Sequence, residues 1–285
     1  DQPAPRPSAP LAPVSEKTEA LKKEVAADVE SRRVFTQQLV DQLFSYSELG
    51  FQETETQRRL TDVLVREGFD VQRSVAGVPT SWVAKIGSGH PIIALGTDID
   101  GLPSTNQTPG VVTRKELVAG APGHGEGHNA GQALIITAAL AVKKVMERDK
   151  LPGTLLLWPG VAEEALGTKA HFVRAGIFKE ADVALFVHVG SDLGTSWGEG
   201  GGSGMVSVEY SFKGSSSHAA AAPWLGKSAL DAVELMDIAW NFKREHLRTQ
   251  QRSHYVITNG GAQPNVRSEE HTSELQSLAY LVCRL

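Results

Sequence analysis

Two apolar runs, each of strand length, constrain the fold most. They are "GTLLLWP" (153–159) and "DVALFVH" (182–188), and helix-forming "EEALGTKAHFVRAG" (163–176) separates them. Continuous apolar runs suit central strands that helices cover on both faces. The long apolar segment 129–149 is predicted as a further helix that ends in basic residues. The alternation predicts an α/β fold with a doubly wound sheet.

The segment before residue 100 extends this pattern. Residues 15–43 contain helix formers without Gly or Pro, and 53–66 predict a second helix with Gly68 as its C-cap. The β-rich runs 81–87 and 91–96 flank a short "SGH", which predicts a hairpin.

A second, smaller α+β domain is predicted after a hinge. "GEGGGSGM" (198–205) has five glycines in eight residues. Beyond it, residues 206–214 and 253–258 predict strands and 226–247 an amphipathic helix. We therefore expect residues 15–203 to form the N-terminal part of one domain and 204–266 an incomplete smaller domain.

Both ends of the chain differ from this pattern. The Pro/Ala/Ser-rich residues 1–14 predict a disordered leader. A remnant of signal-peptide removal and a truncated sequence both explain it, so cytoplasmic and periplasmic or secreted locations stay open. "RSEEHTSELQS" (267–277) matches a translated sequencing adapter, although a native polar helix is the alternative. Residues 267–285, with the single cysteine Cys283, are interpreted as a non-native tail.

Composition excludes some partners. The formal net charge of −5 gives no electrostatic reason for binding nucleic acid or an anionic membrane. No run of about 18 apolar residues is long enough for a transmembrane helix. We expect neither a nucleic-acid nor a membrane partner.

Acidic and imidazole groups cluster where the predicted strands end and before helix 129–149. They are Asp98, Asp100, His124, Glu126, His128, Glu163, Glu164 and His188. Ligands of open α/β sheets gather at the carboxyl ends of strands. Imidazole with carboxylate suits Zn²⁺, Mn²⁺ or Co²⁺, and of two consecutive glutamates one can coordinate while the other acts as a base. A plain loop, a core histidine and an acidic first helical turn are the structural alternatives.

Six ordered motifs resemble one enzyme family. They are "SELGFQETET" (47–56), "GTDIDGLP" (96–103), "GHGEGHNAGQA" (123–133), "GVAEE" (160–164), "FVHVG" (186–190) and "SSSHAAAAPWLGKSALDA" (215–232). Together they resemble the metallo-amidohydrolases of the aminoacylase/carboxypeptidase superfamily, in the p-aminobenzoyl-glutamate hydrolase-like branch, over about residues 30–266. The resemblance implies a catalytic α/β domain with two divalent metals, Zn or Mn, and an inserted dimerisation (lid) domain that makes a homodimer.

The resemblance also assigns roles to residues. It implies that His128, Glu164 and His188 are metal ligands. Asp98 and Asp100 stand where the family has a ligand or a second-shell carboxylate.

Two further positions carry catalytic roles in the family. Glu163 matches the general base that activates water. His218 matches a histidine of the inserted domain that reaches the partner's active site and polarises the scissile carbonyl.

Two departures from the family pattern affect the predicted site. Glu126 replaces a usual cysteine; we expect it to ligate and to shift the metal preference from Zn²⁺ toward Mn²⁺, the alternative being a lost metal position. The family's last ligand, a late histidine, has no counterpart before Val266. The chain as given is therefore interpreted as C-terminally truncated and inactive by itself.

The predicted function is metal-dependent hydrolysis of the amide bond of a small N-acyl or N-aroyl amino acid, such as an aminobenzoyl-glutamate-like substrate. The alternative is a non-catalytic relative that dimerises or binds a ligand.

Overall fold

The computed structural model describes residues 14–197, 202–218, 220–261 and 270–281. The chain divides into two compact units, residues 1–192 and 193–285. Residues 1–13, most of the predicted leader, lie outside the described residues, as do 198–201 of the predicted hinge, 267–269 and Cys283. No helix among the described residues is long and apolar enough to cross a membrane.

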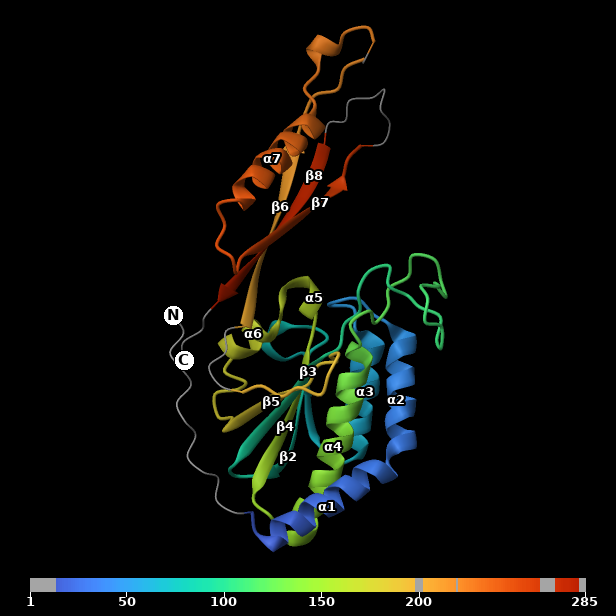
Figure 1. Cartoon of the computed structure of the whole chain (residues 1–285), viewed down its shortest axis with the longest axis vertical. Helices are drawn as coiled ribbons and strands as arrows, with labels where there is room; N and C mark the ends of the chain where they lie inside the picture. Colours follow the sequence, from blue (N-terminus) through green and yellow to red (C-terminus); the bar gives the residue numbers. More distant parts are fainter. Residues whose placement is uncertain (1–13, 198–201, 219, 262–269, 282–285) are drawn as a thin grey trace. The chain divides into compact units, whose positions relative to one another are not determined.

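Unit 1 contains a five-stranded mixed sheet in the order β1-β2-β4-β3-β5 (Figure 1). Its strands are β1 (Asp70–Arg73), β2 (Trp82–Ser88), β3 (Ile92–Asp98), β4 (Gly153–Gly160) and β5 (Val183–Phe186). The short 3-10 helix η1 (Val75–Gly77) joins β1 to β2.

The hairpin predicted between β2 and β3 is wrong. Strand β4 lies between them, antiparallel to β2 and parallel to β3. Two strand spacings amount to about 10 Å, which the few residues from Ser88 to Ile92 can span. A short connection therefore allows a third strand to insert, and apolar β4 occupies that central position, buried along its whole length.

Side chains of β4 alternate between two hydrophobic cores. Leu155 and Leu157 belong to the core beneath helices α2, α3 and α4, whereas Leu156 and Trp158 pack with Phe172 of α6 on the other face. The predicted α/β fold with both faces covered is confirmed. Strand β5, predicted as central, instead lies at the edge of the described sheet, and its residues are exposed.

The helices of unit 1 follow the predicted segments with two interruptions. They are α1 (Glu16–Ser31), α2 (Arg33–Tyr46), α3 (Thr54–Arg66), α4 (His128–Asp149), α5 (Glu163–Leu166) and α6 (Lys169–Arg174). The single helix expected over 15–43 breaks at Arg32, whose backbone leaves helical geometry. The segment 163–176 divides because Gly167 adopts the left-handed conformation, with φ of 65°. Gly68, at φ of 84°, follows the end of α3.

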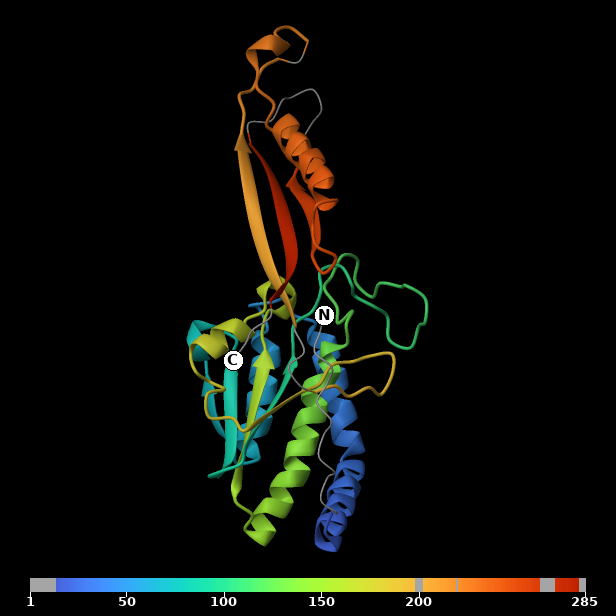
Figure 2. The same ribbon diagram turned by 60° about the vertical axis from the view of Figure 1, so that its left-hand side comes forward.

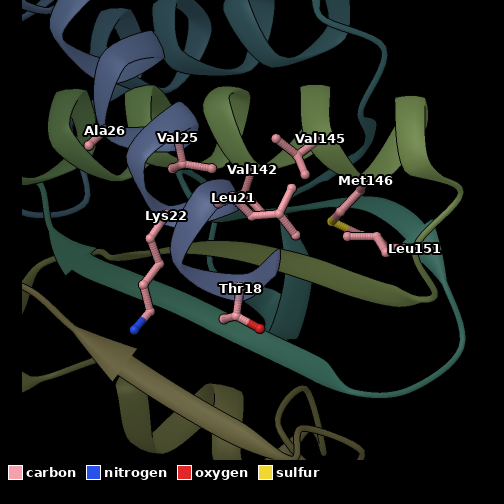
Figure 3. A pocket seen from close by; sticks show the side chains of 9 residues that line it. All are labelled: Thr18, Leu21, Lys22, Val25, Ala26, Val142, Val145, Met146 and Leu151. Atoms are coloured by element: carbon pink, nitrogen blue, oxygen red, sulfur yellow. The ribbon is translucent and has the colours of Figure 1, made fainter. Parts of the chain in front are cut away.

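Helix α4 lies beside α1 and α2 in both views (Figure 2). Between α1 and α4 runs an apolar groove of about 410 Å³ (Figure 3). Its lining includes Leu21, Val25, Val142, Val145, Met146 and Leu151. None of the predicted site residues lines this groove, so it is not the predicted site.

The described residues of unit 2 form a three-stranded antiparallel sheet, the α-helix α7 and a short 3-10 helix. Its elements are β6 (Gly202–Lys213), η2 (Pro223–Leu225), α7 (Ala229–Arg244), β7 (Arg252–Asn259) and β8 (Glu270–Leu281). The predicted β-α-β succession is present as β6, α7 and β7. Strand β8, within the segment interpreted as a non-native tail, pairs with β6 on one side and β7 on the other. The non-native origin of this segment stays a prediction.

Candidate metal centre

The carboxyl ends of β3 and β4 bring the predicted acidic residues together. The strands run parallel, and Asp98 is in register with Gly160. From α4, the Gln132 amide donates to the backbone oxygens of Thr97 (3.3 Å) and Trp158 (3.1 Å). This bridge fixes the first turn of α4 against both strand ends.

Gly127 and His128 mark the start of α4. Gly127 caps the helix in the left-handed conformation, with φ of 76°, and a Cβ there would lie 2.8 Å from Val189. Glycine therefore allows the "GHGEGH" loop to approach the segment after β5 closely. His128, in the first turn, is 3% exposed.

The imidazoles of His128 and His188 face each other. His128 Nδ1 lies 2.9 Å from the backbone oxygen of Asp100, and His188 Nδ1 lies 2.8 Å from that of Val189. Because a carbonyl oxygen only accepts, both Nδ1 atoms carry hydrogens, and each Nε2 is the ring atom left to bind a proton or a metal ion. These two Nε2 atoms are 3.2 Å apart. A proton shared between the two Nε2 atoms, or a metal ion in its place, removes the repulsion of their lone pairs, and metal-binding histidines typically have this tautomer.

Two glutamates bring negative charge to the same place. Glu126, His128 and Glu164 offer ligand atoms within 4.8 Å of one another, as do Asp98, His128 and His188. Burial and the negative charges of Glu126 and Glu163 raise the pKa of Glu164 to about 7. Its buried Oε1 atom has no hydrogen-bond partner. This donor set of imidazoles and repelling carboxylates fits a divalent cation.

Asp100 connects two of the predicted ligands. Its Oδ2 accepts the Glu164 N–H at 3.0 Å, and its Oδ1 lies 3.4 Å from His128 Nδ1. Burial disfavours a charged His128, but the hydrogen bond to Asp100 and the charge of Asp98 outweigh it and raise the pKa of His128 to about 9. Asp100 therefore positions the His128 ring and the backbone of Glu164.

Lys169 is a site residue that was not predicted from the sequence. Its Nζ lies 2.7 Å from Asp98 Oδ1 and 3.7 Å from Glu163 Oε1. Burial raises the pKa of Asp98, and Lys169 opposes that shift. The only signal in the sequence is its place in the first turn of the helix that follows the glutamate pair, where a lysine attracts no notice.

Glu53 was also missed as a separate residue, although it lies within the quoted "GFQETET" motif. It is fully buried; its carboxylate accepts the Ala162 N–H at 2.8 Å and the Thr80 hydroxyl at 2.6 Å. Ala162 is held at φ of 49°, immediately before Glu163. A buried carboxylate thus secures the turn that carries the glutamate pair.

Two predicted histidines lie elsewhere. His124 does not join the cluster: its Nε2 donates to the backbone oxygen of Leu43 at 3.1 Å, and burial lowers its pKa. His218 is exposed in unit 2, where its Nδ1 accepts the N–H groups of Ala220 (3.2 Å) and Ala221 (3.1 Å).

Comparisons with known proteins agree with the resemblance. One subunit of the p-aminobenzoyl-glutamate hydrolase of Escherichia coli is 35% identical over 247 residues, which cover 84% of this chain and 49% of that protein. The chain thus spans about half the length of this curated relative. No family model matches the chain.

Solved structures show the same fold. A putative aminohydrolase from methicillin-resistant Staphylococcus aureus matches 90% of this chain and 66% of its own, with 20% identity and a TM-score of 0.63. A Bacillus subtilis dinuclear metal binding peptidase of the M20 family matches 87% of this chain and 65% of its own, with 23% identity and a TM-score of 0.51. The sequence match confirms the predicted resemblance to the p-aminobenzoyl-glutamate hydrolase-like branch, and the solved structures confirm the predicted fold.

Proposed function

We propose that the whole protein is a metal-dependent amidohydrolase of the p-aminobenzoyl-glutamate hydrolase-like branch, and that this chain supplies most of its metal centre. The substrate class is a small N-acyl or N-aroyl amino acid. The observation that carries the proposal is the pair of facing Nε2 atoms of His128 and His188, surrounded by carboxylates.

His128, His188, Glu126 and Glu164 would hold two divalent ions. Bound ions would polarise the amide carbonyl and make water easier to deprotonate. Glu163 would accept the proton from that water and then deliver it to the leaving nitrogen. Its side chain is partly exposed next to Glu164, a suitable place for a group that must meet substrate.

His218 would donate a hydrogen bond to the carbonyl oxygen of the substrate. Because its Nδ1 accepts two backbone N–H groups, the hydrogen of the neutral ring lies on Nε2. This is the tautomer that can stabilise an oxyanion. As in the resembled family, we propose that it acts on the active site of the partner subunit in a homodimer.

Glu126 makes manganese the proposed metal. A carboxylate is a hard donor, and it lacks the thiolate softness that favours zinc. Metal analysis of protein purified without added metal tests this point. Manganese or mixed oxygen-tolerant ions are expected, whereas stoichiometric zinc alone would contradict the preference.

Glu163→Gln in the whole protein tests the reaction. With Mn²⁺ and p-aminobenzoyl-glutamate, we expect the turnover to fall by roughly 10²–10⁴-fold, because general acid–base catalysis is lost. The Mn²⁺ affinity should stay close to that of the parent. Equal turnover in both proteins would refute the role of Glu163, and turnover in neither would favour a non-catalytic relative.

A further inference from the structure

Lys169 and Asp98 form an ion pair inside the candidate metal centre. Asp98 ends β3, and its side chain is 2% exposed. The ammonium of Lys169 lies 2.7 Å from its Oδ1 and 4.6 Å from the centroid of the Phe186 ring. A buried carboxylate and the face of an aromatic ring both attract this ammonium.

Gly160 leaves the space that this pair fills. A Cβ at residue 160 would lie 1.8 Å from Asp98 Oδ1 and 3.0 Å from Lys169 Cε. The end of β4 is thus shaped around the ion pair, which makes a chance surface contact an unsatisfactory explanation.

The Lys169–Asp98 ion pair disfavours metal binding by one of the two possible ligand groups, the one that contains Asp98. Asp98 could join His128 and His188 around a metal ion. An ion bound to Asp98 would lie close to the ammonium, which contacts the same carboxylate at 2.7 Å, and two neighbouring cations repel each other. Since the ammonium already compensates the negative charge of Asp98, a metal ion would stabilise this carboxylate only slightly more.

We propose that Lys169 is a positioning residue that keeps Asp98 out of the set of metal ligands. The ions are then held by His128, His188, Glu126 and Glu164, with Asp98 as the partner of the ammonium. The 3.7 Å approach of Lys169 to Glu163 Oε1 lets the same ammonium orient the proposed base. This inference rests on the proposed metal-dependent function.

Calorimetric titration of Mn²⁺ into the metal-stripped 285-residue chain tests the inference. We expect Asp98→Asn to keep the dissociation constant within about tenfold of the parent, the lower end of what lost outer-shell support costs. Glu164→Gln, which removes a proposed ligand, is the control and should weaken binding by more than the Asp98 variant does. A loss in Asp98→Asn as large as that in Glu164→Gln would make Asp98 a ligand and overturn the inference.

Lys169→Met removes the ammonium instead of the Asp98 carboxylate. Freed from the ammonium, Asp98 can reach the metal, so we expect Mn²⁺ to bind about tenfold more tightly or better, an effect that corresponds to about 1.4 kcal/mol. Adding Asp98→Asn to this variant should abolish the gain, and Lys169→Arg, which keeps the cation, should behave like the parent. An unchanged affinity in Lys169→Met would also overturn the inference.

Thermal unfolding gives a second readout. Without metal, Lys169→Met should melt below the parent, because a buried carboxylate loses its partner, and Mn²⁺ should raise its Tm by more than it raises that of the parent. An equal rise in both proteins would count against the inference. If the parent binds no Mn²⁺ at all, the proposed function fails, and this inference fails with it.

Discussion

At the scale of single residues, a short motif predicts which side chains could bind a metal better than it predicts which residues those side chains contact. The "GHGEGH" loop and the glutamate pair indicated His128 and Glu164, and the structure brings both within ligand distance. The same loop suggested His124, which instead hydrogen-bonds α2. Lys169 and Glu53 could not be found from the sequence, because a lone lysine or glutamate acquires its role only from the buried groups that folding brings to it.

Glu53 gives a prediction at this scale. Glu53→Ala should lower the free energy of unfolding by roughly 3 kcal/mol, because the Ala162 N–H and the Thr80 hydroxyl lose their buried acceptor. Glu53→Gln, which keeps one carbonyl oxygen, should cost less. Urea denaturation measures both, and a loss well under about 1 kcal/mol in Glu53→Ala would show that these two hydrogen bonds contribute little.

At the scale of elements, the apolar pattern predicted the helices and strands but not their order in the sheet. Hydrophobic runs report burial, and β4 is accordingly buried on both faces. They do not report which strand lies next to which, so the expected β2–β3 hairpin was wrong. Nor do they fix position within the sheet, since β5 is as apolar as a central strand and yet lies at the edge.

The approach of α4 to β3 yields a second prediction. In most helices Gly→Ala is stabilising by up to about 1 kcal/mol. At Gly131, however, a Cβ would lie 2.1 Å from Thr97 Oγ1. We expect Gly131→Ala to destabilise the protein by about 1–3 kcal/mol through overpacking.

Gly190→Ala is the matched control, because its nearest neighbour would be 3.6 Å from the new Cβ. Chemical denaturation should show little change for it. A stabilised Gly131→Ala would mean that α4 does not pack so closely on β3.

The contact of α1 with α4 predicts a dependence on pH. Asp28 of α1 binds Lys144 of α4 at 2.8 Å and Arg32 at 2.7 Å, and the hydrogen bonds from Lys144 and then Arg32 lower its pKa below 3.8. A carboxyl group whose pKa is lower in the folded state than in the unfolded state stabilises the folded protein. This stabilisation is complete above the pKa of the unfolded state and is lost as the pH falls through the pKa of the folded state.

Asp28→Asn should therefore cost up to about 1 kcal/mol at neutral pH, since the partners are largely solvated. Below pH 3.8 the difference from the parent should shrink, which unfolding curves across the acid range can follow. A difference that is constant with pH would rule out the ion pairs as its cause.

At the scale of the whole molecule, the residues with proposed catalytic roles lie in both units. Unit 1 holds the candidate metal centre, and unit 2 carries His218. If His218 acts on the partner subunit, Glu163→Gln and His218→Ala should complement each other in the whole protein. In an equal mixture that exchanges subunits, half of the dimers contain one subunit of each variant, and one of the two sites in each such dimer is intact. We therefore expect the mixture to recover up to about a quarter of the parental turnover.

Each variant measured alone is the control for complementation and should remain nearly inactive. Mixtures that stay inactive although sedimentation shows mixed dimers would place His218 in the active site of its own subunit or outside catalysis.

The most direct test of the central claim is the binding of Mn²⁺ to the metal-stripped chain, followed by the paramagnetic resonance of the free ion. We expect the parent to remove Mn²⁺ from solution and His128→Ala, which deletes the imidazole common to both ligand groups, to do so far less. Equal depletion of free Mn²⁺ by the two proteins, or none by the parent, would contradict a metal centre at the ends of β3 and β4.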